Sequence, residues 1–300
     1  MISSERGVRS EENGRKPELI CNDRGVALII VLLVTALLIA LIFEFAYGTR
    51  VSLRAAVNFR NSQRAYYLAR SGVNFVGRYL SGNLQQGIDP VTGRDLRYDR
   101  LEQKEPYTVP FIPGNDVVLN VTWEDEAGKI KITDVQTNPY RQIMLNTLFE
   151  NKSIDRTVLD KMTNINSGIN RLGFLTGLHQ YMNDTDYLKV NNFVTTSQVD
   201  RIDINTASPE VLQSLGISSS TVELIREARP FTDHARVSEF AGISNAFLPT
   251  TTLRTANFLT ETSDVFKVVS EATVGGYTKR VEAVITRSAS GYTVNYWRAW

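Results

Sequence analysis

The sequence predicts an α+β protein in which a long N-terminal helix begins in a membrane and an all-helical segment interrupts a sheet. Residues 26–43 form an apolar run long enough to cross a bilayer. Strand signals at 107–134 and again from residue 256 enclose a block, 138–253, where apolar residues recur every three or four positions. Strands on both sides of a helical block indicate one sheet domain with a helical insertion.

Composition restricts the function classes. The 300 residues carry 33 Lys and Arg against 32 Asp and Glu, a net charge of +1, whereas nucleic-acid binders normally carry a clear basic excess. One cysteine, Cys21, excludes an internal disulfide framework and a cysteine-rich zinc site. The two histidines, His179 and His234, are expected to be interior or surface side chains, not metal ligands. No GxSxG, HExxH, P-loop or dinucleotide motif is present, so neither an enzyme nor a cofactor is expected.

The apolar run Val26–Phe43 has Thr35 as its only polar residue. At about 1.5 Å per residue it makes roughly 27 Å of helix, close to the hydrocarbon thickness of a bilayer. A secretory signal would be shorter and would end in a small-x-small cleavage site, but Glu44 and Phe45 follow this run. The run therefore predicts a single-pass membrane anchor. The flanking cations do not decide its orientation, because five precede the run and six arginines follow it before residue 80.

The helix is expected to continue beyond the membrane to residue 80. Residues 44–80 contain no proline, and their apolar side chains recur at intervals of mostly three or four residues. The arginines of this segment are Arg50, Arg54, Arg60, Arg64, Arg70 and Arg78. The first four form two i,i+4 pairs whose members largely share a face. This basic stripe is either a solvated face with extended stems, or a contact with lipid headgroups or with acids of a neighbouring subunit.

Residues 81–106 are polar and contain glycine and proline, so a loop is predicted. The strands expected next lie at about 107–112, 116–123 and 129–134, with an acidic turn at 124–128 before the last one. From residue 256 strand signals return, and Gly275-Gly276 marks a hairpin turn.

Within the helical block, apolar spacing predicts helices at 141–149, 154–162, 206–215 and 221–228. Ser208-Pro209 marks a helix start, because proline is tolerated in the first turn, where its missing N–H costs little. Ser218–Ser220 is expected to cap the next helix, which Pro230 ends.

A charged leader ending in Arg24-Gly25, an immediate apolar helix and its long amphipathic continuation resemble the N-terminus of the type IV prepilins. The resemblance implies cleavage by the prepilin peptidase between Gly25 and Val26, and methylation of the new N-terminus. The fifth mature residue of most such proteins is glutamate, but here it is Ile30. A carboxylate within the bilayer costs about 2.5–3.5 kcal/mol on insertion scales, so most members keep it for a reason. The K-type minor pseudopilins of type II secretion typically lack this acid.

Three further segments resemble the K class, in the same order along the chain. They are the acidic turn, Gly-Lys and strand of Val121–Ile132, the asparagine-threonine-alanine signature of Asp203–Leu215, and the closing strands from Ser263 to Trp297. The resemblance implies a long helix packed on a small antiparallel pilin-like sheet that a large all-α domain interrupts. The implied divisions are a leader at 1–25, a transmembrane and amphipathic helix at 26–80, a sheet domain at 81–135 plus 255–300, and a helical insertion at 136–254.

The function that the resemblance implies is that of a minor pseudopilin at the tip of the type II secretion pseudopilus, which helps to initiate assembly for the export of folded proteins. The implied partners are the I- and J-type minor pseudopilins, the prepilin peptidase, the inner-membrane secretion platform and the lipid bilayer. The implied location is the bacterial inner membrane, with the C-terminal domain in the periplasm. A minor pilin of a type IV pilus is the alternative from the same structural class.

A second alternative is a membrane-anchored DNA receptor, because residues 205–229 also resemble a helix-hairpin-helix unit. The hairpin at 215–218 lacks the second glycine, and the unit carries three acids against two arginines. A surface that follows phosphates should be basic, so a structural role is favoured and no nucleic-acid partner is expected.

Calcium is the one metal that the acidic clusters could suggest as a ligand. Acids gather at 124–126 and at 184–186, with Asp200 and Asp203 nearby. The glycine and distant glutamate of an EF-hand loop are absent after Asp184. Solvated turns are therefore favoured over a calcium site.

Overall fold

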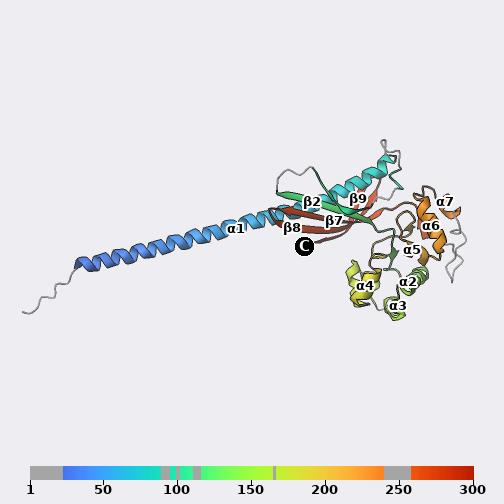
Figure 1. Cartoon of the computed structure of the whole chain (residues 1–300), viewed down its shortest axis with the longest axis horizontal. Coiled ribbons are helices and arrows are strands. Elements are labelled where there is room, and N and C mark those ends of the chain that lie inside the picture. Colours follow the sequence, from blue (N-terminus) through green and yellow to red (C-terminus); the bar gives the residue numbers. More distant parts are fainter. Residues whose placement is uncertain (1–22, 89–94, 99–101, 111–115, 165–166, 240–257) are drawn as a thin grey trace, which may run out of the picture. The chain divides into compact units, whose positions relative to one another are not determined.

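The computed structural model describes residues 23–88, 95–98, 102–110, 116–164, 167–239 and 258–300 (Figure 1). The chain divides into two compact units, residues 1–57 and 58–300. Helix α1 (Asp23–Gln86) provides the described part of the first unit and continues into the second. The second unit also contains a sheet and a helical part, each with its own core.

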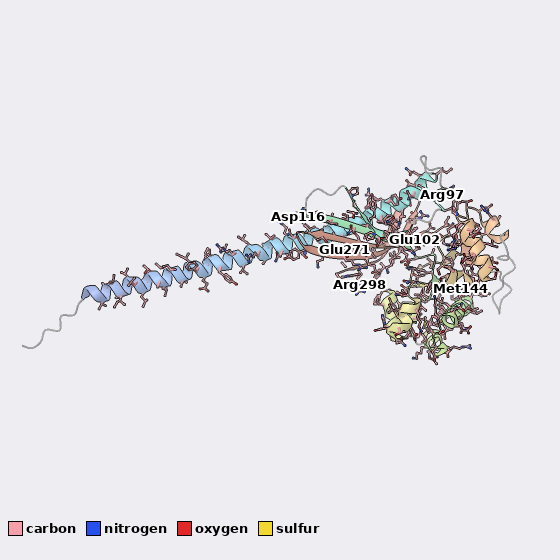
Figure 2. The ribbon with its side chains drawn as sticks, in the orientation of Figure 1. Arg97, Glu102, Asp116, Met144, Glu271 and Arg298 are labelled. Carbon is pink, nitrogen blue, oxygen red and sulfur yellow. The ribbon has the colours of Figure 1, made fainter. Side chains whose placement is uncertain are left out.

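The described part of the first unit is helical throughout, and its side chains are exposed from Val26 to Val57 (Figure 2). α1 is long and apolar enough to cross a membrane, with a mean hydropathy of 3.4 over an 18-residue window. Soluble monomers rarely expose a contiguous apolar surface of this extent. The helix therefore fits the single-pass anchor predicted from the sequence.

The sheet is antiparallel and has the strand order β1-β2-β7-β8-β9. Its strands are β1 (Gln103–Thr108), β2 (Val117–Asp125), β7 (Val265–Val274), β8 (Tyr277–Ser288) and β9 (Gly291–Ala299). Gly275 and Gly276 join β7 to β8 with φ angles of +55° and +81°. Two successive positive φ values suit the tight hairpin turns that glycine favours, so the predicted hairpin is confirmed.

The second half of α1 packs on one face of this sheet (Figure 1). The core between them contains Ala69, Val73, Val76, Leu80, Leu119, Val121, Trp123, Phe266, Val268, Ala272, Val281, Ala283 and Ile285. Two helix glycines make the close approach possible. A Cβ at Gly72 would lie 2.2 Å from Ser270 Oγ and 2.8 Å from Val121 Cγ1, and one at Gly77 would lie 2.7 Å from the ring of Tyr292.

The helical part lies in the chain between β2 and β7. Its elements are β3 (Ile130–Lys131), α2 (Pro139–Asn151), α3 (Arg156–Thr163), the 3₁₀ helices η1 (Ile169–Arg171) and η2 (Leu175–Gln180), α4 (Asp184–Val190), β4 (Val194–Thr195), β5 (Ile202–Asp203), α5 (Pro209–Ser214), α6 (Ser219–Ala228), α7 (His234–Glu239) and β6 (Leu259–Thr260). The short strands form two parallel pairs, β3 with β4 and β5 with β6. Fully buried side chains such as Met144 fill its core (Figure 2).

The predicted α+β fold is confirmed, and so are the predicted helix starts. Ser208 Oγ accepts a hydrogen bond of 3.3 Å from the N–H of Val211 at the start of α5. Ser218 Oγ accepts one of 3.2 Å from the N–H of Thr221 in the first turn of α6. Each serine supplies an acceptor to an N–H that the helix itself cannot satisfy.

The segment predicted as a loop, 81–106, differs from the structure at both ends. α1 continues to Gln86, since Ser81 is buried and its hydroxyl donates to the carbonyl of Gly291 at 2.7 Å. At the other end, β1 begins at Gln103, which lies opposite Trp123 of β2. The polar residues at 81–86 suggested exposure to solvent, but Ser81 and Asn83 are buried.

The strand predicted at 129–134 also differs from the structure. β3 has two residues and pairs with β4, not with the five-stranded sheet. Ile130, Ile132 and Val135 lie in the core of the helical part. The chain has therefore entered the core of the helical part by Ile130.

Candidate functional site

The predicted processing site lies at the start of α1. Gly25 and Val26 are in its first turn, and Ile30 follows one turn later, 57% exposed. The fifth residue after the predicted cut is thus an apolar side chain on the surface of an apolar helix. Cleavage between Gly25 and Val26 stays a prediction.

The acidic turn predicted as solvated is buried, which corrects that interpretation. Asp125, at the end of β2, is 2% exposed. Its Oδ1 accepts from the N–H of Ala127 at 2.7 Å and from the Ser263 hydroxyl, and its Oδ2 accepts from the Thr206 hydroxyl. A buried carboxylate needs such donors, because desolvating it unpaired would be very costly. Asp125 therefore connects three segments that are distant in the sequence.

Asp203 and Asn205 extend this group of buried polar contacts into the helical part. We call Asp125, Asp203, Asn205 and their hydrogen-bonding partners the buried junction. Asp203 is 4% exposed, and its Oδ1 accepts from the N–H of Asn205 at 2.9 Å. Asn205, 2% exposed, donates from Nδ2 to the carbonyls of Phe231 at 3.0 Å and Glu261 at 2.9 Å. Its Oδ1 accepts from the N–H of Phe231 at 2.7 Å. The asparagine of the family-like signature thus holds two otherwise separate segments by its side chain.

Burial changes the ionisation of both junction carboxyls. Desolvation raises the pKa of Asp125 to about 6, although the donors from Ser263, Thr206 and Ala127 lower it. Desolvation and then the negative charge of Asp125 raise the pKa of Asp203 well above its usual range. A carboxyl whose pKa is higher in the folded state binds more protons when folded than when unfolded.

Stability should therefore fall as the pH rises through this region. The free energy of unfolding decreases between about pH 4, near the unfolded pKa, and pH 7, above the folded pKa of Asp125, which is about 6. Asp203→Asn removes one of the two carboxyls and keeps an oxygen for the N–H of Asn205. When the pH is raised from 5 to 7.5, the variant should therefore lose less stability than wild type, as urea unfolding in detergent measures. Parallel pH profiles for the two proteins would contradict this coupling.

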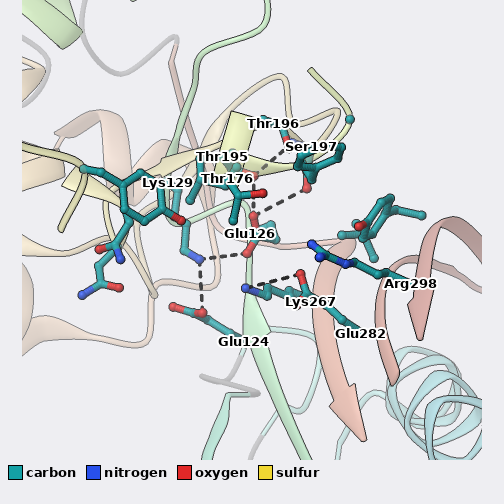
Figure 3. A pocket seen from close by; sticks show the side chains of 18 residues that line it. Glu124, Glu126, Lys129, Thr176, Thr195, Thr196, Ser197, Lys267, Glu282 and Arg298 are labelled. Carbon is teal, nitrogen blue, oxygen red and sulfur yellow. Dashed lines mark hydrogen bonds and ion pairs between the residues drawn. The ribbon is translucent and has the colours of Figure 1, made fainter. Parts of the chain in front are cut away.

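A second polar cluster lies beside the junction and lines a cavity of about 170 Å³ (Figure 3). Lys129 Nζ lies 2.8 Å from Glu126 Oε1 and 3.1 Å from Glu124 Oε2. Burial alone would lower the pKa of Lys129, but the charges of Glu126 and then Glu124 raise it, so the amine stays protonated. The Thr195 hydroxyl donates to Glu126 Oε2. The acidic turn is thereby fixed to β4 of the helical part.

The sheet provides the opposite wall of this cavity. Lys267 of β7 and Glu282 of β8 lie 3.7 Å apart, and Arg298 of β9 points toward the same space (Figure 3). The lining thus combines three acids with three cations. These charges largely balance one another, so the arrangement suits fixing the two cores together better than holding a charged ligand.

Arg287 is a buried side chain near the junction that donates hydrogen bonds to three backbone carbonyls. Its side chain is 1% exposed. Nε donates to the Ser263 carbonyl at 2.8 Å, Nη1 to the Leu80 carbonyl at 3.4 Å, and Nη2 to the Arg97 carbonyl at 3.2 Å. The guanidinium also lies over the ring of Phe266, 5.3 Å from its centroid. One arginine of β8 therefore ties α1, the 95–98 segment and the chain entering β7.

The helix-hairpin-helix-like segment is built into the helical core. Gly216 has a φ of +80°, and Ile217 after it is 4% exposed. Arg229 donates from Nη2 to the Ala207 carbonyl at 2.6 Å, and Arg226 pairs with Glu223 at 2.9 Å. Both arginines of the unit thus engage groups of the same chain, which favours the structural interpretation.

The other acidic cluster lies at the exposed start of α4. Asp186 accepts from Asn183 at 3.0 Å and pairs with Lys189 at 3.0 Å. Asp184, 91% exposed, lies 3.0 Å from His179 Nδ1. Among the described residues, no group of three or more His, Cys, Asp and Glu side chains is placed to hold a metal ion. His234, the other histidine, begins α7, and its side chain lies outside the described residues.

These features define a pilin-like α+β fold, with a long N-terminal helix on an antiparallel sheet and a helical part inserted after β2. Among solved structures the chain matches the GspK chain of the crystal structure of the GspK-GspI-GspJ complex from the enterotoxigenic Escherichia coli type 2 secretion system. The TM-score is 0.63 at 14% sequence identity, covering 82% of this chain and 99% of that chain. No family model and no curated protein matches the sequence. The likeness to the K class is therefore confirmed at the level of the fold.

Proposed function

We propose that the chain is a minor pseudopilin of a type II secretion system and serves as its K-type subunit. The observation that carries this proposal is the fold likeness to 99% of the GspK chain, in a protein whose N-terminal helix is also long and apolar enough to span a membrane. The sequence supports it independently through the leader, the missing acid at Ile30 and three ordered segments. Two of these segments supply Asp125 and Thr206, which the structure joins directly.

In this proposal the I- and J-type minor pseudopilins are the partners, as in the complex in which the GspK chain was solved. The chain is anchored in the inner membrane, is processed between Gly25 and Val26, and carries its C-terminal domain in the periplasm. It initiates the pseudopilus and occupies its tip. The apolar Ile30 suits that place, because a subunit with none above it has no use for an acid that pairs with a neighbour's amino terminus.

Co-expression with candidate partners tests the proposal. The full chain should co-purify with the I- and J-type minor pseudopilins encoded in the same genome. Failure to bind them, together with a stable complex with the minor pilins of a type IV pilus, would favour the alternative function. The tip position is tested separately by Ile30→Glu, which should leave pseudopilus assembly unchanged or impaired, whereas improved assembly would count against it.

A further inference from the structure

A stripe of four side chains runs along α1 just after the apolar run. We call Phe43, Tyr47, Arg50 and Arg54 the interfacial stripe. With 3.6 residues per turn, these positions fall within about 60° of the helix circumference. All four are exposed, Phe43 at 71% and Tyr47 at 73%. Along the helix, the side chains of the stripe therefore change from the hydrocarbon ring of Phe43 to the phenol of Tyr47 and then to the guanidiniums of the two arginines.

The spacing of the stripe matches the layers of a bilayer surface. If the apolar run fills the hydrocarbon core up to Phe43, Tyr47 lies about 6 Å beyond it and Arg50 and Arg54 about 10 and 16 Å beyond it. Tyrosine is enriched at the membrane interface. Long arginine stems can carry their charge back toward the headgroups, and a Debye length of about 8–10 Å extends the attraction further.

The charge of this segment is positive except at one residue. Glu44 is the only acid between residues 26 and 88. It lies about 120° around the helix from Arg50 and about 80° from Arg54. No acid therefore lies within the stripe itself, and the two guanidiniums present a field that attracts anions. Guanidinium is also the side-chain group best matched to phosphate, because its planar fork donates two parallel hydrogen bonds.

We propose that Arg50 and Arg54 bind the phosphates of anionic phospholipid headgroups in the leaflet at the C-terminal end of the apolar run. The inference rests on the membrane anchor of the proposed function, but not on its role in secretion. It assigns a function to the arginines that follow the apolar run. The positive-inside rule places Lys and Arg on the cytoplasmic side, so it does not explain arginines next to a domain proposed to be periplasmic. Bound headgroups fix the depth of the helix and the direction of the stripe.

The test uses the full chain reconstituted in vesicles of phosphatidylcholine and phosphatidylglycerol at three to one. Spin-labelled lipids report, by electron paramagnetic resonance, how strongly each lipid associates with the protein. Wild type should prefer phosphatidylglycerol several-fold at low salt, with up to about fivefold from each arginine. The preference should fall toward one at 0.5 M salt, because screening weakens charge contacts at a surface.

The double variant Arg50→Gln/Arg54→Gln should lose most of this preference. The matched control is Arg60→Gln/Arg64→Gln, an exposed pair with the same spacing. These two arginines lie about 26 and 32 Å beyond Phe43 along the helix, and the control should keep the preference. Equal selectivity in wild type and the Arg50/Arg54 variant, or equal loss in the control, would overturn the inference. A chain that alkaline carbonate extracts from the vesicles would overturn the anchor and the proposed function as well.

Discussion

Replacing Arg287 by alanine should lower the free energy of unfolding by about 3–5 kcal/mol, because it removes a buried charge from several hydrogen-bonding partners at once. The carbonyls of Ser263, Leu80 and Arg97 lose a charged donor in a water-poor site. The ring of Phe266 also loses the guanidinium that lies over it. Urea unfolding of the full chain in detergent, followed by tryptophan fluorescence, measures the loss.

The matched control for this variant is Arg280→Ala. Arg280 lies on the same strand, is exposed, and contacts the ring of Trp300 at 5.4 Å from its centroid. An exposed cation–π contact contributes about 0.5–1 kcal/mol, so this control should lose no more than that. Similar losses for Arg287→Ala and Arg280→Ala would show that the buried contacts of Arg287 do not stabilise the fold.

Asn205→Ala should be the second most damaging change, with a loss of about 3 kcal/mol. The variant removes three buried hydrogen bonds, two donated to the carbonyls of Phe231 and Glu261 and one accepted from the N–H of Phe231. Each such bond contributes about 0.5–1.5 kcal/mol, and leaving its partner unsatisfied costs more.

The control for Asn205→Ala is Asn295→Ala on β9. Asn295 is exposed, and its Nδ2 donates to Thr286 Oγ1 at 2.6 Å. Water replaces an exposed hydrogen bond readily, so the expected loss is within about 0.5 kcal/mol. An Asn205→Ala variant as stable as this control would remove the structural explanation of the asparagine-threonine-alanine signature.

Much of the fold could be predicted because local chemistry determines it. The apolar run of α1, the glycine pair at 275–276 and the capping serines Ser208 and Ser218 each act within a few residues of themselves. A hairpin turn with two positive φ values or a helix N-terminus with a free N–H selects its residue types directly. Such elements follow from sequence without knowledge of what they pack against.

The buried junction could not be predicted in this way. A Glu-Asp-Glu run reads as a solvated turn, because charged residues are almost never buried unless they are paired. The groups that make burial of Asp125 possible, Thr206 and Ser263, come from positions 81 and 138 residues away. The resemblance to the K class included all three segments. It did not indicate that their polar side chains contact one another.

The prediction of where α1 ends was wrong for a related reason. The polar letters of residues 81–86 indicate a loop, and only the tertiary contact of Ser81 with Gly291 shows why the helix continues. The glycines at 72 and 77 likewise look unfavourable inside a helix. Their cost is offset by the close approach of the helix to Ser270 and Tyr292 that a side chain would prevent.

The proposed function requires that this chain is processed and membrane-anchored, and intact-mass analysis with N-terminal sequencing tests that requirement most directly. Protein purified from cells with an active prepilin peptidase should begin at Val26, and protein from cells without the peptidase should retain all 300 residues. A chain that keeps its full length in the presence of the peptidase, or that begins at any residue other than Val26, would contradict the proposed function.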